Sequence, residues 1–210
     1  MMRFVLACVV MLIYGQAIGQ DDFELLKNTQ ALKEGVKAMA ANTNSITTAF
    51  KQEKHISILT KPLKSKGQMY FKKPDMLKWA YTSPYDYAII FKAETIIIND
   101  EGKVSNFDLS ASKSFMEINQ IIVNSVSGNI LQEEQFDIQY LSSSKYYLAK
   151  MVPKAEQLKS YISVIEVYID RNDFTVSKIK LIEKGGDYTL IDFYNKSLNT
   201  DVSDEIFEEQ

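Results

Sequence analysis

Most of the chain alternates apolar and polar residues with a period of two, and this pattern constrains the fold more than any other feature. Successive side chains of a β-strand point to opposite faces, so the alternation predicts strands that each have one apolar face. The expected strands span residues 45–59, 65–72, 76–81, 87–91, 95–98, 103–107, 136–141, 145–152, 161–169, 175–183 and 188–194. About eleven strands are therefore expected.

Short joints rich in Pro, Asp, Asn, Ser and Gly connect many of these strands, and such residues favour tight turns. The joints include 73–75, 82–84, 99–102, 170–173 and 184–187. They are too short for the crossover that parallel strands need, so the strands should pair antiparallel. A long antiparallel sheet curls rather than staying flat. The fold class expected is mainly β (α+β), a single curled sheet forming an incomplete β-barrel in one domain.

Two further segments have apolar residues at helical spacing. The first follows Asp21 and Asp22, which are suitable N-cap residues, and is expected to end near Ala41. The second follows Ser112 and carries an apolar face over residues 115–130. An apolar helix face must cover something, and the concave face of the sheet is the available surface. The helices are therefore expected to form a lid over the sheet.

Residues 1–19 are expected to be a cleaved secretory signal peptide, which leaves a domain of residues 20–210. Arg3 provides a positive charge, and the apolar run that follows is too short to span a bilayer. Ala17 and Gly19 place small residues at the two positions that a signal peptidase reads. The alternative is a lipoprotein acylated at Cys8, but only four residues separate Cys8 from Arg3, too few for an apolar signal core.

Composition excludes several classes of function. A net charge of -3 disfavours nucleic-acid binding, because binding to phosphates needs a basic surface. One Cys and one His leave no basis for a zinc cluster or a disulfide framework. The sequence has no Gly-x-Ser-x-Gly elbow and no phosphate-binding Gly-rich loop, and the single histidine, His55, is expected to face solvent. No catalytic residue, metal or cofactor is therefore expected, and the protein is not expected to be an enzyme.

One group of large apolar residues is predicted to share the inner face of neighbouring strands. The group consists of Met69, Phe71, Leu77, Trp79, Tyr81, Ile89 and Phe91. The simplest interpretation is that these residues form a core. A curled sheet of about eleven strands, however, encloses more space than its own side chains readily fill. The second interpretation is an apolar cavity under the helices that binds a lipid-like ligand.

Residues 67–85, GQMYFKKPDMLKWAYTSPY, resemble the signature of the LolA family, the periplasmic outer-membrane lipoprotein carrier proteins. The family pattern is a strand beginning with Gly, a basic residue before Pro, and an aromatic strand of the form basic-Trp-x-Tyr-x-x-Pro. Residues 49–52 are similar to its Ser-Phe-x-Gln element, and residues 201–207 to its closing element. Residues 148–154 resemble its Leu-x-Pro-Lys stretch with insertions, whereas 104–130 match the family only loosely.

The resemblance implies a periplasmic carrier that works as a monomer. It would accept lipoproteins from an inner-membrane ABC lipoprotein-releasing complex, shield their acyl chains and pass them to an outer-membrane acceptor. Family members commonly have Arg before the central Pro, where it helps to hold the lid shut, and this chain has Lys73. Lysine lacks the planar fork of arginine, so a less favoured closed state is expected.

Two other functions remain open. A periplasmic binding protein for a free lipid or another small amphiphile would use the same apolar cavity. A sensor or scaffold domain would keep the fold with a filled interior. If the predicted group of seven residues lines a cavity, the substitution Phe71→Glu is expected to abolish lipoprotein binding.

Overall fold

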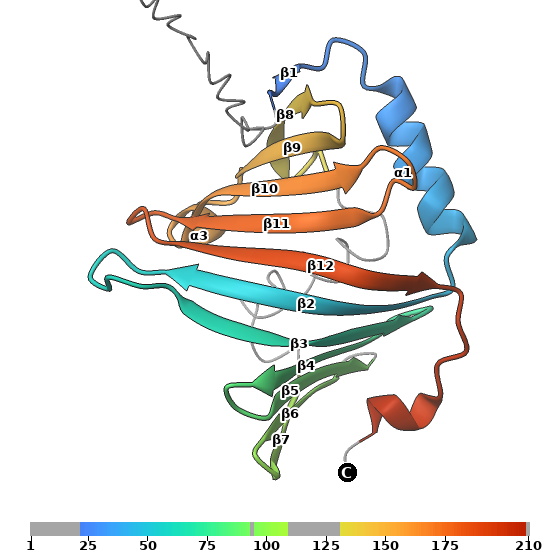
Figure 1. The fold of residues 1–210 in the computed structure, drawn as a ribbon, viewed down its shortest axis with the longest axis vertical. Helices are drawn as coiled ribbons and strands as arrows, with labels where there is room; N and C mark the ends of the chain where they lie inside the picture. Colours follow the sequence, from blue (N-terminus) through green and yellow to red (C-terminus); the bar gives the residue numbers. More distant parts are fainter. Residues whose placement is uncertain (1–21, 93–94, 109–130, 209–210) are drawn as a thin grey trace, which may run out of the picture.

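The computed structural model describes residues 22–92, 95–108 and 131–208. Within them, twelve strands form one open antiparallel sheet with the order β1-β8-β9-β10-β11-β12-β2-β3-β4-β5-β6-β7 (Figure 1). The strands are β1 (Glu24–Leu25), β2 (Ser45–His55), β3 (Leu63–Lys72), β4 (Met76–Ser83), β5 (Tyr87–Lys92), β6 (Thr95–Asp100), β7 (Lys103–Asp108), β8 (Phe136–Ser142), β9 (Tyr146–Pro153), β10 (Ile162–Asp170), β11 (Val176–Glu183) and β12 (Tyr188–Leu198).

The eleven expected strands are all present, with ends that differ from the expected ones by a few residues. The twelfth is the two-residue strand β1, whose Leu25 pairs with Leu141 of β8. Every neighbouring pair is antiparallel, as the short joints predict. The sheet consists of two meanders, β2–β7 and β8–β12, which the pairing of β12 with β2 joins.

The described residues include the helices α1 (Gln30–Asn42) and α3 (Glu156–Lys159) and the 3₁₀ helix η2 (Asp204–Phe207). The expected start of the first helix after Asp22 is wrong. Residues 24–25 pair with β8 instead, and the Leu26 N–H donates to the Tyr140 carbonyl at 2.9 Å. The helix begins where Asn28 Oδ1 accepts a hydrogen bond from the Gln30 N–H at 3.0 Å. The helix expected after Ser112 lies outside the described residues.

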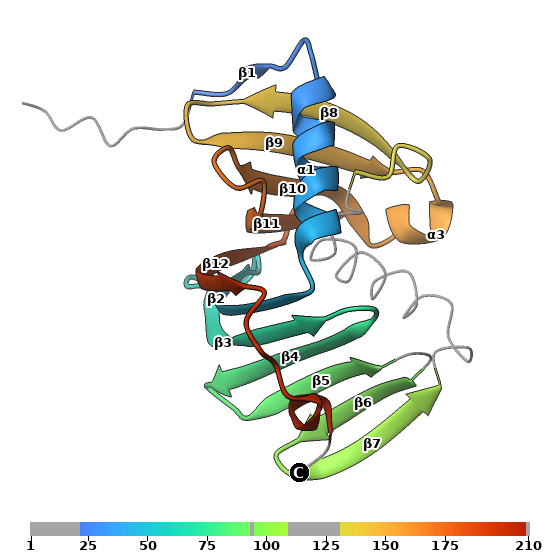
Figure 2. The ribbon, with the colours of Figure 1, turned by 90° about the vertical axis from the view of Figure 1, so that its right-hand side faces the viewer.

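The helix α1 crosses one face of the sheet, called here the inner face (Figure 2). Its Leu32 and Val36 are buried against side chains of β9 and β10, such as Ala149 and Val167. Directly paired residues share a face, so the register extends the inner face from β9 and β10 through Ile179, Ile191 and Phe193 to β2–β6. Phe193 contacts both apolar clusters of this face, which makes the core continuous from one meander to the other.

The opposite, outer face carries a smaller core. Ile90 of β5 is 2% exposed and packs against Val202 and Phe207 from the C-terminal segment. Lys72 holds this segment in place, because its Nζ donates to the Val202 carbonyl at 2.8 Å and forms an ion pair with Asp204 at 2.5 Å. The C-terminal segment therefore covers the outer face of β4 and β5, whereas α1 packs on the inner face of β8–β11.

Candidate functional site

The seven apolar residues predicted to share a face form one cluster on β3, β4 and β5. The register aligns six of them in two rows across the strands, Met69–Trp79–Ile89 and Phe71–Leu77–Phe91, and pairs Tyr81 with Gly67 and Tyr87. Five of them are buried, and Tyr81 and Ile89 are half-buried. The sequence prediction that these side chains meet on one face is confirmed, whereas their role in ligand binding stays a prediction.

An aromatic group centred on Phe50 of β2 joins this cluster to the rest of the core. The Phe50 ring is 4.3 Å from the Trp79 ring and 5.3 Å from the Tyr81 ring, measured between centroids. Phe193 of β12 meets Trp79 edge-on at 5.9 Å. The sequence marks Phe50 as part of the motif at residues 49–52 and does not mark Phe193. The only sequence signal for Phe193 is its alternation with Ile191.

Gly67 of β3 makes this aromatic packing possible. It is paired with Phe50 on one side, next to a bulge in the pairing of β3 with β4. A Cβ at this position would lie 1.9 Å from the Ala80 carbonyl oxygen and 2.7 Å from Phe50 Cζ. A glycine inside a strand often marks such a close approach of backbone and side chain. Gly67 therefore gives the Phe50 ring room to lie flat over β3.

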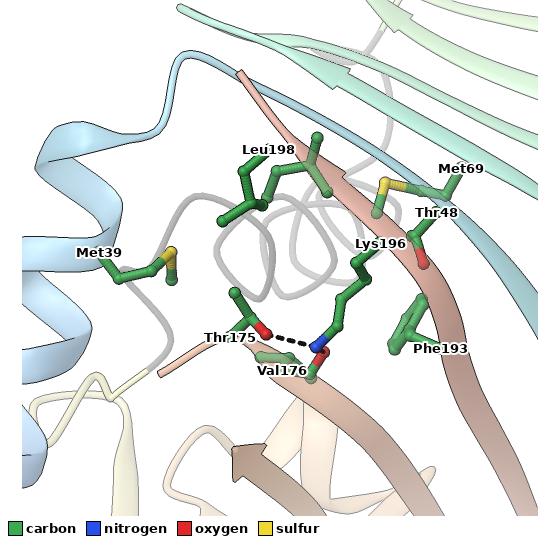
Figure 3. Close-up of a pocket in the computed structure, with 9 residues that line it drawn as sticks. Met39, Thr48, Met69, Thr175, Val176, Phe193, Lys196 and Leu198 are labelled. Atoms are coloured by element: carbon green, nitrogen blue, oxygen red, sulfur yellow. Dashed lines mark hydrogen bonds between the residues drawn. The ribbon is translucent and has the colours of Figure 1, made fainter. Parts of the chain in front are cut away.

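A small cavity lies between α1, β2, β3, β11 and β12 (Figure 3). Its lining residues are Met39, Ile46, Thr48, Met69, Thr175, Val176, Phe193, Lys196 and Leu198. The cavity volume is about 30 Å³, the room of about one water molecule, and is much smaller than an engineered apolar cavity of about 150 Å³ that binds benzene. Of the seven predicted residues only Met69 lines it, so this cavity by itself has no room for an acyl chain.

Lys73, the predicted lid contact, lies at the C-terminal end of α1. Its Nζ donates to the carbonyls of Ala40 at 2.8 Å and Ala41 at 3.3 Å, and its backbone N–H donates to the Asn44 carbonyl at 2.8 Å. The last carbonyls of a helix carry partial negative charge, so a cation there is stabilising. Lys73 thus attaches the β3–β4 turn to the end of the helix that covers the inner face.

Asn199, just after β12, fixes the same end of α1. Its Nδ2 donates to the Asn42 carbonyl at 2.9 Å, and its Oδ1 accepts from the Asn44 N–H at 2.6 Å. Asn199 has φ +57°, a conformation that asparagine tolerates better than most residues. No sequence pattern pointed to this residue, because its partners lie more than 150 positions away.

Lys196 of β12 places an ammonium group against the apolar cavity. Its Nζ donates to Thr175 Oγ1, to the Val176 carbonyl at 3.2 Å and to Ser177 Oγ at 3.4 Å. Burial lowers the pKa of Lys196, and the charges of Asp173 and Asp170 oppose this decrease. Lys196 lies beyond the expected strand 188–194, and a strict alternation from Phe193 places it on the outer face, so the sequence does not predict its position at the cavity.

His55 lies at the end of β2 and is partly exposed. Its ring stacks on Tyr188 at 4.3 Å between centroids, and its Nε2 is 3.4 Å from Glu53 Oε2. Across the part of the chain that the structure describes, no group of three or more His, Cys, Asp or Glu side chains could hold a metal ion. Within the same residues, no helix is long and apolar enough to cross a membrane.

Residues 41–210 match the model of a family described as outer membrane lipoprotein carrier protein LolA. No curated protein matches the chain. Similar solved structures include an uncharacterized conserved protein from Thermus thermophilus, with 8% identity and a TM-score of 0.54 over 87% of this chain and 93% of that one. The Pseudomonas aeruginosa MucA/MucB complex matches with 10% identity and a TM-score of 0.50 over 85% and 61%. A LolA superfamily protein from Nitrosomonas europaea has 12% identity and a TM-score of 0.46 over 88% and 99%.

Proposed function

Because the chain belongs to the LolA family, described as outer membrane lipoprotein carrier proteins, we propose that it binds the acyl chains of lipoproteins and carries them across the periplasm. The donor is an inner-membrane ABC lipoprotein-releasing complex, and the recipient is an outer-membrane acceptor. Residues 1–19 direct export and are cleaved, and residues 20–210 act as a monomer. The acyl chains contact Met69, Phe71, Leu77, Trp79, Tyr81, Ile89 and Phe91.

The continuous apolar inner face, which α1 covers in part, is the observation that supports this proposal. Two clusters of large apolar side chains meet at Phe193, and α1 adds only two fully covered side chains, Leu32 and Val36, to one of them. Displacing α1 would expose apolar surface that an acyl chain could cover in its place. The cavity beside Met39 of α1 is then the point at which opening begins.

The closed state sets the affinity of this carrier. Burying a chain of sixteen carbons completely would contribute roughly 12 kcal/mol, at about 0.8 kcal/mol per CH₂ group. A protein that releases its cargo without ATP needs a much smaller net free energy of binding. Moving α1 breaks its contacts with the sheet and with Lys73, and this cost lowers the net affinity. The lid therefore makes release possible.

Release of labelled lipoproteins from spheroplasts tests the proposal. Adding the protein purified from periplasm should release newly made, radiolabelled lipoproteins as a soluble one-to-one complex. Absence of release, with bound lipid found by native mass spectrometry, would favour the binding protein for free lipids instead. Absence of both would contradict acyl binding and favour the scaffold function.

Two matched variants locate the binding face. Ile89→Asn changes the inner face of β5 and Ile97→Asn the outer face of β6, and both residues are half-buried isoleucines on neighbouring strands. We expect Ile89→Asn to reduce the yield of soluble complex at least tenfold, because a polar side chain disrupts the apolar row. Ile97→Asn should lose comparable stability and keep the yield. Equal yields from the two variants would contradict the assignment of the inner face.

The contact of Lys73 with α1 predicts a local effect on helix dynamics. Lys73→Met removes two hydrogen bonds from one partly exposed ammonium, together worth roughly 1 kcal/mol, so amide hydrogen exchange in the last turn of α1 should accelerate about fivefold. The neighbouring variant Lys72→Met is the control, because it should accelerate exchange in the C-terminal segment around Val202 instead. Unchanged exchange at the end of α1 in Lys73→Met would show that Lys73 does not hold the helix.

A further inference from the structure

A bulge in β12 directs Lys196 toward the inner face. Tyr194 pairs with Ala49 and Ser197 with Thr47, so Asn195 and Lys196 together oppose Thr48. Asn195 has φ +53°, which is unusual for a residue in a strand. An extra residue in one strand changes the direction in which the following side chains point. The bulge thus turns the Lys196 side chain to the inner face, whereas a strictly alternating strand would place it on the outer face.

The sheet is open at the same place. β11 and β12 pair only from Lys178–Asp192 to Ile182–Tyr188, and the last residues of β12 pair with β2 alone. The cavity lies at this opening, and Figure 3 shows the Lys196 ammonium beside Val176 and Thr175 with Met39 of α1 on the opposite side. An ammonium group therefore stands where the two apolar clusters and α1 meet.

The acceptors that Lys196 contacts are all neutral. They are two hydroxyl groups and one carbonyl, and the Thr175 hydroxyl in turn donates a hydrogen bond to Asp173 Oδ1 at 2.6 Å. Partial burial disfavours the charge of the ammonium, and the charges of Asp173 and Asp170 offset this cost only in part. The three acceptors engage all three N–H donors of the ammonium, and the contact with Ser177 Oγ at 3.4 Å is the longest of the three. A negatively charged oxygen would be a stronger acceptor than this hydroxyl and would replace it. The remaining lining is apolar apart from the hydroxyls of Thr48 and Thr175.

We propose that Lys196 binds the oxygen-bearing end of an acyl chain, either the carboxylate of a fatty acid or the ester or amide carbonyl of a lipid anchor. The cavity of about 30 Å³ has room for one oxygen atom of such a group. Met69 belongs both to the cavity lining and to the cluster on β3–β5, so the hydrocarbon continues from the cavity over Met69 once α1 has moved. This inference rests on the proposed function, and it adds the direction in which the chain lies and the chemistry that selects it.

Competition between amphiphiles of equal chain length tests the role of Lys196. The neutral fluorescent probe N-phenylnaphthylamine is first bound to the full mature protein. Its displacement then measures the affinity of three competitors, each below its micellar concentration: dodecanoate, methyl dodecanoate and dodecyltrimethylammonium. We expect dodecanoate to bind at least tenfold more tightly than dodecyltrimethylammonium. In Lys196→Met this ratio should fall to about one, and in Lys196→Arg it should be retained. Lys78→Met, a change on the outer face of β4, should leave the ratio unchanged.

The ligands also separate the possible outcomes. Weaker binding of dodecanoate alone in Lys196→Met identifies a carboxylate, and weaker binding of the methyl ester as well identifies a carbonyl. The inference is wrong if the wild-type protein binds all three ligands equally. It is also wrong if Lys196→Met is less stable but keeps the affinity ratio of dodecanoate to dodecyltrimethylammonium. In both cases Lys196 only links β11 to β12, and acyl binding stands. If no ligand displaces the probe, the proposed function itself fails. Lys196→Gln, which keeps a donor without a charge, gives the same ratio test if Lys196→Met does not fold.

Discussion

Replacing Phe50 with alanine is expected to lower the free energy of unfolding by about 3–5 kcal/mol. The Phe50 side chain is 0% exposed and contacts the rings of Trp79 and Tyr81, so its removal leaves a cavity at the centre of the inner face. Gly67 has no side chain to fill the space below the ring. The residues around Phe50 therefore cannot collapse easily into the cavity, which places the expected loss in the upper part of the range.

Urea denaturation followed by the fluorescence of the single tryptophan, Trp79, measures this loss. Trp79 is itself in contact with Phe50, so circular dichroism should be recorded as a second probe. Phe107→Ala is the control, because Phe107 on β7 is 51% exposed and its replacement should change the stability by roughly 0.5 kcal/mol or less. A similar small loss in both variants would mean that the Phe50 ring is not packed as described.

Phe71→Glu is expected to prevent folding rather than only to weaken lipoprotein binding. Phe71 is 1% exposed and lies between Ile46 of β2 and Leu77 of β4 in the register of the sheet. A carboxylate at this position would be buried without a partner, at a cost of several kcal/mol even if it takes up a proton. Analytical size exclusion and circular dichroism should show an unfolded or aggregated protein.

This expectation changes what the variant can test. Loss of lipoprotein binding in Phe71→Glu would follow from unfolding alone, so it would not identify the binding face. A cooperative unfolding transition in Phe71→Glu, close to that of the wild-type protein, would contradict the burial of Phe71. The half-buried Ile89 is a better position for a binding variant, because a polar side chain there can reach solvent.

The strands and the group of seven apolar residues followed from the sequence because both depend on local alternation. Residues that alternate along β3, β4 and β5 must share a face, and short turns fix which residues lie side by side. Met69, Trp79 and Ile89 therefore align as the pattern predicts. The start of α1 was not predictable in this way, since residues 24–25 have helical spacing but pair with the distant strand β8.

The features that the sequence did not reveal all depend on distant partners or on a change of period. Asn199 acts through Asn42 and Asn44, which no local pattern associates with it. Lys196 reaches the inner face only because a bulge interrupts the alternation of β12. Lys73 was found because a motif marked its position, and the structure adds the carbonyls of Ala40 and Ala41 that it contacts.

The pairing of β12 with β2 has a consequence for how the chain acquires its fold. β2 can form a hairpin with β3 as soon as β3 is made, and β4–β7 can add in turn, but the other edge of β2 must wait for the last strand of the chain. Contacts between residues so far apart in sequence form slowly, because a long loop must close first. The two meanders thus stay separate until synthesis is almost complete.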